Sequence, residues 1–300
     1  MLSKAHLDII TACVFFHWGR EMFKLIKAVF RILFIIIIMA SIAFAYARYI
    51  EPQMLQIKEV TVKSTHVKAE ANNLTIALFA DTHFGEYYSI DDFSDVLSSI
   101  EEIDPDMVIF AGDLIDHYDS YKEDVSKIST ELTKIEAPYG KYAVFGNHDY
   151  GGGAENVYQG IMEAGGFQVL KNEYFALEEL GIAIIGIDDT IIGYGEAEIA
   201  SWGRSDYFNI VLSHAPDVVD DVLDYNVDLM LSAHTHGRQI NIKYFDEYIL
   251  PTYGKKYVKG LYEFENSRGT QLYVNSGIGM TKMPYRFLSP PELTYITLSY

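Results

Sequence analysis

The chain has 300 residues, 49% of them hydrophobic and 22% charged, a balance typical of folded globular proteins that excludes wholesale disorder. Its formal net charge is −19. The first 50 residues hold six of the 23 Lys and Arg and two of the 42 Asp and Glu, so residues 51–300 carry 17 against 40, a net charge of −23. Such an acidic surface repels phosphate backbones, so we expect no nucleic-acid partner. The single cysteine excludes an internal disulfide and a thiolate metal cluster.

The N-terminal region carries the pattern of a membrane span. Residues 32–47 contain no charge and include four consecutive isoleucines. With residues 28–30 and a snorkelling Arg31 the segment reaches about the 20 residues that cross a bilayer. Basic residues precede it, which places the N-terminus in the cytoplasm and residues 51–300 outside the cell membrane. We therefore predict a cytoplasmic lead over 1–27, a single-pass transmembrane signal anchor over 28–48, and a linker over 49–72.

Alternatives to a retained anchor stay open at this point. The sequences around Ala45 and Ala47 both fit a signal-peptidase site, and cleavage there would yield a secreted domain. Met22 begins a compact basic segment and is a second candidate for the start of translation. A buried core helix is the third alternative, which the basic flanks disfavour.

Beyond the linker, short apolar runs alternate with amphipathic stretches. Residues 74–80, 107–111 and 142–145 are typical of buried strands, and helical spacing separates them over 91–103 and 121–136. This β-α-β-α-β order predicts parallel strands joined by right-handed crossovers. After a helix near 154–165, strands predominate. We expect them at 182–187, 210–213, 229–232, 271–275 and 293–298, in one domain over 73–300.

Five short polar clusters each follow a predicted strand. Ligands in open α/β sheets gather at the carboxyl ends of strands, so the five clusters are expected to meet at one rim. They are Asp81-Thr82-His83, Gly112-Asp113-Leu114-Ile115-Asp116, Gly146-Asn147-His148-Asp149, Ser213-His214-Ala215-Pro216-Asp217 and Ala233-His234-Thr235-His236-Gly237.

This rim offers carboxylate, imidazole and amide groups without sulfur, a set that suits Mn, Fe, Zn or Ni. In Asp-x-His and His-x-His, alternate side chains of an extended segment lie on one side and can reach one ion. A carboxylate can bridge two ions, and Asp113 is the natural candidate. Two bridged metals can bind a phosphate and turn a water into hydroxide. A lone histidine is more often structural, but five such clusters in order have no shared structural explanation.

The same five clusters resemble the signature blocks of the calcineurin-like metallophosphoesterase superfamily, from about residue 73 to the C-terminus. The Ser-His-Ala-Pro-Asp block, the anchor and the closing segment Arg286–Leu293 are similar to bacterial membrane-associated phosphodiesterases of the YaeI/YkuE type. The resemblance implies an α/β fold, the four-layer αββα metallophosphoesterase sandwich, preceded by one transmembrane helix.

The resemblance also implies a role for each site residue. Asp81, His83 and His236 would bind the first metal, with Asp113 as the bridge to the second. His148 would stabilise the transition state or protonate the leaving oxygen, and Asp149 would orient it. A hydroxide bridging the metals would attack phosphorus in line. The remaining ligands of the second metal would be Asn147, His214 and His234.

Two arginines are candidates for substrate binding. Arg238 stands where the family pattern has glycine, and it is expected either to bind a phosphate as a bidentate donor or to pair with a surface carboxylate. Arg286 belongs to a basic group that is interpreted as an anionic-headgroup site or as a solvated face. That group also contains Lys255, Lys256, Lys259 and Lys282.

Together these features predict a membrane-anchored, metal-dependent phosphodiesterase. It would cleave phosphodiester or pyrophosphate bonds of a phosphorylated lipid or another cell-envelope substrate. The resemblance suggests UDP-2,3-diacylglucosamine, a precursor in lipid A biosynthesis, although that substrate forms on the cytoplasmic side and conflicts with the predicted topology. The alternative is a non-catalytic, metal-stabilised binding protein at the membrane surface.

Overall fold

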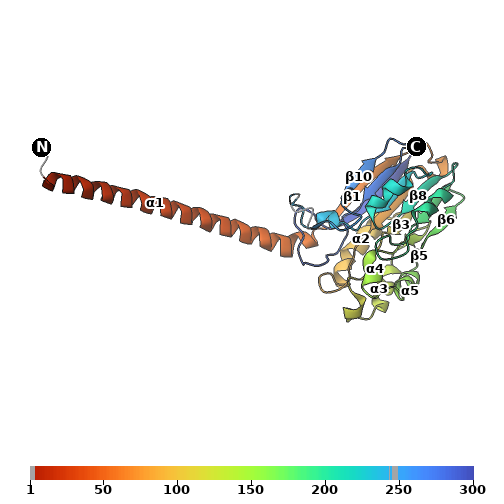
Figure 1. The fold of residues 1–300 in the computed structure, drawn as a ribbon. Coiled ribbons are helices and arrows are strands. Elements are labelled where there is room, and N and C mark those ends of the chain that lie inside the picture. Colours follow the sequence, from red (N-terminus) through yellow and green to blue (C-terminus); the bar gives the residue numbers. More distant parts are fainter. Residues whose placement is uncertain (1–3, 243, 245–248) are drawn as a thin grey trace. The chain divides into compact units, whose positions relative to one another are not determined.

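The computed structural model describes residues 4–242, 244 and 249–300, and the chain divides into two compact units, Met1–Ala47 and Arg48–Tyr300. The first unit consists of helix α1 (Lys4–Ala45), coloured red in Figure 1. Its apolar side chains from Ile32 to Ile42 are exposed. By length and composition, it is the one helix among the described residues that could cross a membrane.

The second unit contains two six-stranded mixed sheets. The first sheet has the order β1-β12-β2-β3-β4-β5. Strands β2 to β5 run parallel, whereas β12 is antiparallel to β2 and parallel to β1. This sheet contains the predicted strands that begin near residues 74, 107, 142 and 293. Its strands are β1 (Gln56–Lys63), β2 (Thr75–Phe79), β3 (Met107–Phe110), β4 (Lys141–Ala143), β5 (Gln168–Val169) and β12 (Glu292–Ser299).

The second sheet has the order β10-β11-β9-β8-β7-β6, with parallel pairs from β11 to β7 and antiparallel strands at both edges. The apolar runs near 182, 210, 229 and 271 form its central strands, as predicted. Its strands are β6 (Glu173–Leu177), β7 (Ile182–Gly186), β8 (Phe208–Leu212), β9 (Leu229–Ser232), β10 (Gly260–Glu263) and β11 (Gln271–Val274).

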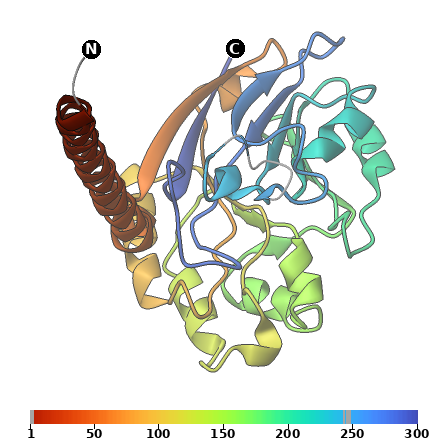
Figure 2. The same cartoon turned by 60° about the vertical axis from the view of Figure 1, so that its left-hand side comes forward.

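The two sheets pack face to face, and helical segments cover their outer faces (Figure 2). Alternate side chains of β2, such as Ile76 and Leu78, enter the core between the sheets, whereas Ala77 and Phe79 pack under the helices. Short 3-10 helices and α6 (Val219–Val222) cover the second sheet. The predicted four-layer α/β fold is thereby confirmed. The helices over the first sheet are α2 (Ser94–Ile103), α3 (Ser126–Leu132), α4 (Asn147–Gly151) and α5 (Tyr158–Ala164).

The predicted linker over 49–72 is wrong, because this segment belongs to the folded domain. Strand β1 pairs along its whole length with β12, near the other end of the chain. As an edge strand β1 buries only Val62, so its sequence lacks a continuous apolar run. Glu51, just before it, is 1% exposed. Pairing with a strand more than 200 residues away determines this segment, and local patterning does not reveal it.

Candidate metal centre

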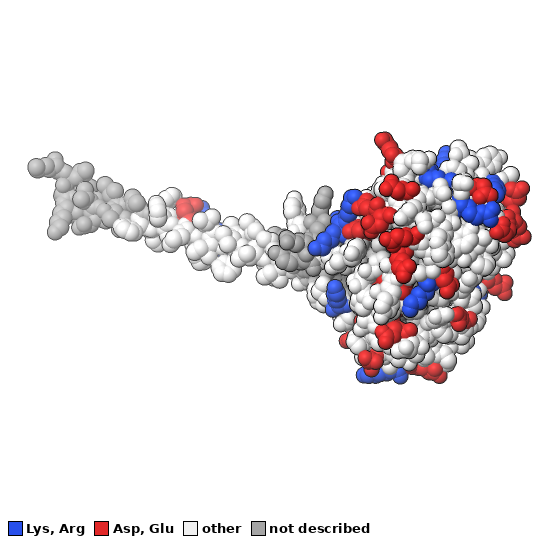
Figure 3. Space-filling model, turned by 45° about the vertical axis from the view of Figure 1, so that its right-hand side comes forward, with Lys and Arg blue, Asp and Glu red and all other residues white. Residues whose placement is uncertain are grey.

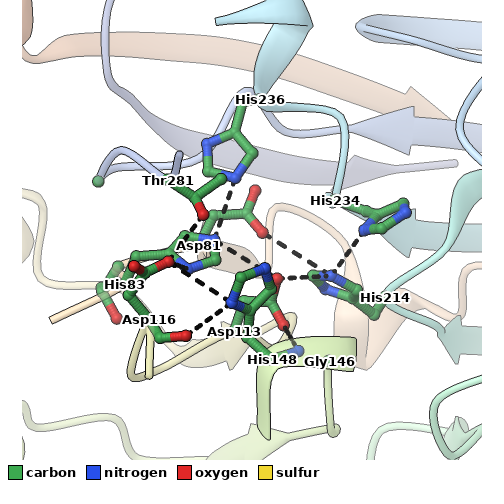
Figure 4. A network of polar contacts seen from close by, with 12 residues as sticks. Asp81, His83, Asp113, Asp116, Gly146, His148, His214, His234, His236 and Thr281 are labelled. Carbon is green, nitrogen blue, oxygen red and sulfur yellow. Dashed lines mark hydrogen bonds and ion pairs between the residues drawn. The ribbon is translucent and has the colours of Figure 1, made fainter. Parts of the chain in front are cut away.

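The five polar clusters follow β2, β3, β4, β8 and β9, and their side chains meet at the carboxyl ends of the two sheets (Figure 4). Backbone hydrogen bonds join the loops: the Asp81 N–H donates to the carbonyl of Gly112 at 2.9 Å, and the His83 N–H to that of Asp113 at 3.1 Å. Loops fixed to one another in this way hold side chains from distant parts of the chain in one arrangement.

Several proposed ligands have backbones in the left-handed region, which non-glycine residues rarely adopt. Each such residue costs on the order of 1–3 kcal/mol, and such strain collects at functional sites. The strain is retained because the surrounding loops fix each position. The φ values are +51° at Asp81, +43° at His83, +61° at Asp113, +71° at His234 and +51° at His236.

Asp81, His83 and His236 form one candidate metal site, with their ligand atoms within 4.8 Å of one another. The two histidines bring their Nε2 atoms to 3.1 Å. Both carboxylate oxygens of Asp81 are buried and have no hydrogen-bond donor among the described residues. Burial raises the pKa of Asp81 to about 6. A cation beside this buried carboxylate would stabilise its charged form, so the group fits a metal ion.

Asp113, His214 and His234 form a second candidate site. His214 directs Nδ1 to the carbonyl of Ala111 at 2.7 Å, and His234 directs Nε2 to that of Thr252 at 2.9 Å. A carbonyl only accepts, so both of these nitrogens carry protons. The other two ring nitrogens face each other at 3.1 Å.

The second site requires a positive charge between these rings. Although burial opposes it, Asp113 and Asp81 raise the pKa of His214 to about 10, whereas burial and His214 lower that of His234 to about 3. A proton on His214 can supply the charge, and so can a divalent ion bound by both nitrogens. The buried Asn147 Oδ1, which lacks a partner within the described part of the chain, offers a further oxygen ligand.

Asp113 lies between the two sites. Its Oδ2 is 3.4 Å from His83 Nε2 in one site and 3.2 Å from His214 Nε2 in the other. Its Oδ1 accepts the backbone N–H of His148 at 2.8 Å. Despite burial, the neighbouring histidines hold the pKa of Asp113 well below its usual range. The geometry therefore suits a carboxylate shared by two cations.

Asp116 is a site residue to which the sequence analysis gave no role. Its carbonyl accepts the Nδ1–H of His148 at 2.7 Å, and its carboxylate lies 3.2 Å from His83 Nδ1. Thr281 donates its hydroxyl to the same carboxylate at 2.7 Å. Asp116 thus orients His148 and holds a ligand of the first site. The spacing in the Gly112-Asp113-x-x-Asp116 block could have indicated this role. Asp116 stands three residues after Asp113 in the same loop, and a loop of that length can contact the two loops beside it.

Asp149 does not have the role that the resemblance implied. Its carboxylate accepts three backbone N–H groups: Gly146 at 2.8 Å, Asp113 at 2.9 Å and Leu114 at 3.0 Å. The expected orientation of His148 by Asp149 is corrected, because Asp116 accepts the Nδ1–H. Burial and the nearby Asp113 raise the pKa of Asp149 to about 7. Asp149 fixes the loop that presents Asp113.

Arg238 lines a cavity of about 140 Å³ together with Asp113, Asn147 and His148. Its φ is +79°, a conformation that suits the glycine of the family pattern. The cavity thus combines candidate metal ligands with a guanidinium. The other wall residues outside the ligand clusters are Gln239, Ile240, Ile249, Pro251, Thr281, Lys282 and Met283.

The expected substrate contact by Arg286 is wrong, because this side chain is fully buried. Its guanidinium donates to the carbonyls of Ser276, Gly277, Gly279 and Ser289 at 2.6–3.2 Å. All three nitrogens are engaged, so Arg286 holds two loops together. The sequence alone does not distinguish a buried, fully paired arginine from an exposed one, which is why the expectation for Arg286 failed.

The lysines grouped with Arg286 do not form one basic patch. Lys256 pairs with Asp220 at 2.8 Å, and Lys259 lies 3.7 Å from the buried Glu292. Lys282 lines the cavity beside the candidate metal sites. These lysines are close in the sequence, but in the structure they have different partners and locations and do not form one binding surface.

Fold and site together define a metallophosphoesterase. The family model described as "Calcineurin-like phosphoesterase" matches residues 74–238, and the chain belongs to this family. It is 40% identical over 259 residues to the metallophosphoesterase YkuE of Bacillus subtilis, covering 85% of this chain and 89% of YkuE. It is 28% identical over 265 residues to phosphodiesterase YaeI of Escherichia coli, covering 87% and 94%. These similarities indicate a hydrolase acting on ester bonds.

Proposed function

We propose that this protein is a membrane-anchored phosphohydrolase that holds two divalent ions and cleaves phosphodiester or pyrophosphate bonds. Asp81, His83 and His236 would hold the first ion, and Asn147, His214 and His234 the second. Asp113 would be shared between them. The ions, when bound, supply Lewis-acid activation of water and of the phosphate. The sulfur-free ligand set suits Mn, Fe, Zn or Ni.

The position of Asp113 is the observation that carries this proposal. One carboxylate oxygen lies 3.4 Å and 3.2 Å from histidine nitrogens of two separate ligand groups. Asp113 holds this position at a strained φ of +61°, and the carboxylate of Asp149 fixes its backbone. Strain of this kind collects at functional sites.

The chain's own residues supply orientation and a proton. His148 lines the cavity, and the Asp116 carbonyl fixes its protonated Nδ1, which leaves Nε2 to act on the phosphate or leaving oxygen. Although burial opposes it, nearby carboxylates, Asp113 first, raise the pKa of His148. Arg238 on the cavity wall is suited to a phosphate oxygen.

The substrate that these features favour is a phosphorylated lipid or another envelope phosphodiester. The cavity wall combines Arg238 and Lys282 with the apolar Ile240, Ile249 and Met283. Basic residues before the apolar segment favour a domain outside the cytoplasm, anchored or, after cleavage, secreted. The lipid A precursor UDP-2,3-diacylglucosamine is one pyrophosphate substrate to test, and its cytoplasmic origin disfavours it under this topology.

The test is hydrolysis of bis(p-nitrophenyl) phosphate and p-nitrophenyl phosphate by the full-length protein loaded with Mn, with metal content measured in parallel. Turnover of the diester that is lost in Asp113→Asn, together with a fall in bound metal, supports the proposal. Two bound ions without turnover, also after loading with Fe, Zn or Ni, would favour the non-catalytic binding protein. Asp221→Ala, an exposed carboxylate in α6, serves as the matched control.

A further inference from the structure

The segment that follows the apolar helix is fastened to a loop near the metal centre. The carboxylate of Glu51 is buried and accepts the backbone N–H of Leu288 at 2.9 Å and that of Ser289 at 2.5 Å. Ser289 in turn donates its hydroxyl to the carbonyl of His236 at 2.9 Å. Two consecutive hydrogen-bonded steps therefore connect Glu51 with a candidate metal ligand.

The same loop is joined to the wall of the cavity. Residues Ile240 and Phe287 form a parallel β-bridge, in which the Asn241 N–H donates to the Phe287 carbonyl at 2.8 Å. The Asn241 side chain also donates to the carbonyl of Leu288 at 3.2 Å. Ile240 lines the cavity. The loop at 286–289 is therefore hydrogen-bonded to the segment that lines the cavity.

Leu288 presents a large apolar side chain to the solvent in an unfavourable backbone conformation. It is 59% exposed, and its φ is +56°. A positive φ is rare for leucine, and an exposed leucine becomes informative only together with other exposed apolar residues. Glu51 holds this conformation through the Leu288 N–H. The neighbouring Tyr49, Ile50 and Met54 are exposed as well. We call Tyr49, Ile50, Met54 and Leu288 the apolar rim.

Chain connectivity fixes how far this rim can lie from a bilayer that α1 spans. The predicted span ends at Arg48, three residues before Glu51, and an extended residue covers at most about 3.6 Å. Glu51 is therefore within about 11 Å of the end of the span. Leu288 lies next to Glu51, because its backbone N–H donates a hydrogen bond to the Glu51 carboxylate. Amphipathic Tyr49 and basic Arg48 suit the headgroup layer.

Surface charge does not favour contact of the domain with an anionic membrane. Acidic side chains are spread over the face shown in Figure 3. Asp91, Asp92 and Asp95 line the same pocket as Arg48 and Tyr49. The anchor therefore has to bring this edge to the bilayer, with Arg48 next to the rim in the chain and Lys282 on the cavity wall.

We infer that the apolar rim rests on the bilayer that anchors the protein, and that the metal centre takes its phosphodiester from lipid headgroups of that same bilayer. This inference rests on the proposed function. Water is the co-reactant: its oxygen bonds to phosphorus, one P–O ester bond breaks, and the leaving oxygen takes a proton. The products are a phosphate monoester and an alcohol, one of which stays in the membrane.

The first measurement tests docking without any substrate. In the full chain with Cys13→Ser, Leu288→Cys is labelled with an NBD fluorophore and placed in phosphatidylglycerol–phosphatidylethanolamine vesicles. We expect a blue-shifted emission that doxyl lipids quench by about twofold or more, because the label lies in the interface. Trp202→Cys, an exposed position over the outer face of the second sheet, is the matched control. Equal, solvent-like emission at both positions would overturn the inference.

The second measurement separates this inference from the proposed function. Headgroup-labelled phosphatidylethanolamine is supplied in the protein's own vesicle or in separate vesicles, beside the soluble bis(p-nitrophenyl) phosphate. We expect cleavage only in the protein's own vesicle, and a loss of about tenfold in Leu288→Asn with unchanged soluble turnover. Asparagine tolerates positive φ, so this variant should fold.

Each outcome of the second measurement decides one proposal. Soluble turnover without lipid cleavage, or equal cleavage in both vesicle populations, overturns the inference and leaves the phosphohydrolase intact. If the wild type does not hydrolyse the soluble diester, the proposed function is overturned. The fluorescence measurement then still decides whether the rim contacts the membrane.

Discussion

The carboxylate of Asp149 accepts the backbone N–H of Asp113 at 2.9 Å, and so it fixes the residue that lies between the two ligand groups. The same carboxylate also accepts the N–H groups of Leu114 and Gly146. Three loop positions therefore depend on one buried side chain. This arrangement assigns Asp149 to the support of the site and leaves proton transfer to His148.

Asp149→Ala is expected to destabilise the protein by about 3–5 kcal/mol, because three buried N–H groups lose their acceptor. Binding of Mn should weaken together with stability, since Asp113 loses its backbone support. Urea unfolding monitored by circular dichroism measures the first effect, and metal titration the second. Asp221→Ala, at an exposed position, should change stability by no more than about 0.5 kcal/mol. Equal stability of both variants would contradict this role.

Asp116→Asn keeps the backbone carbonyl that orients His148 and removes only the carboxylate charge, which lies 3.2 Å from His83 Nδ1 and 3.5 Å from His148 Nδ1. The variant is expected to lower kcat by about tenfold with little change in KM, because both histidines lose that charge behind the reacting groups. Thr281→Ala removes only the hydroxyl that donates to Asp116 and should have a smaller effect in the same direction. Steady-state kinetics on a soluble diester measures both. A raised KM at constant kcat would instead place Asp116 in substrate binding.

Metal binding is expected to release a proton at pH 7. Asp113 and Asp81 raise the pKa of His214 to about 10 in the metal-free protein despite its burial, so its ring is protonated at neutral pH. A histidine must lose its extra proton before it can bind a metal, and the apparent affinity for Mn should therefore rise by up to about tenfold per pH unit between pH 6 and 8. Calorimetry in two buffers with different ionisation enthalpies counts the protons. Binding without proton release would show that His214 is neutral before the metal arrives.

Arg238→Ala is expected to raise KM for a phosphodiester about tenfold, the loss of one charge-assisted hydrogen bond. Arg238→Lys should restore affinity only in part, because an ammonium lacks the bidentate fork. Arg238→Gly should lose the same affinity but gain up to about 1 kcal/mol of stability, since glycine accepts φ of +79° without strain. Arg204→Ala, an exposed arginine paired with Glu178 and Asp206, is the control. An unchanged KM in Arg238→Ala would make Arg238 a surface residue.

Glu51→Ala is expected to cost about 3 kcal/mol and to weaken metal binding, because the buried N–H groups of Leu288 and Ser289 lose their acceptor near His236. Thermal unfolding and Mn titration of the full chain measure the two effects. Glu59→Ala, an exposed position in the neighbouring β1, should leave both nearly unchanged. If both glutamate variants behave alike, the loop at 286–289 holds its conformation without Glu51.

Local sequence determined the elements whose residues interact with near neighbours or follow a strong periodicity. The central strands were readable because continuous apolar runs such as residues 76–79 and 210–212 are buried on both faces. The polar clusters after these strands were readable because the carboxyl ends of parallel strands must meet at one edge. The α/β class and the location of the site therefore follow from the sequence.

Tertiary structure decided which partner each polar group finds. Asp149 and Asp116 stand in the same sequence blocks as the candidate ligands, yet one supports backbone and the other orients His148. Arg286 is buried among carbonyl groups, and β1 is defined by its pairing with β12. Sequence fixes the donor and acceptor types along the chain. Burial, charge and the distances between loops then select among the available partners, and these quantities exist only once the chain has folded.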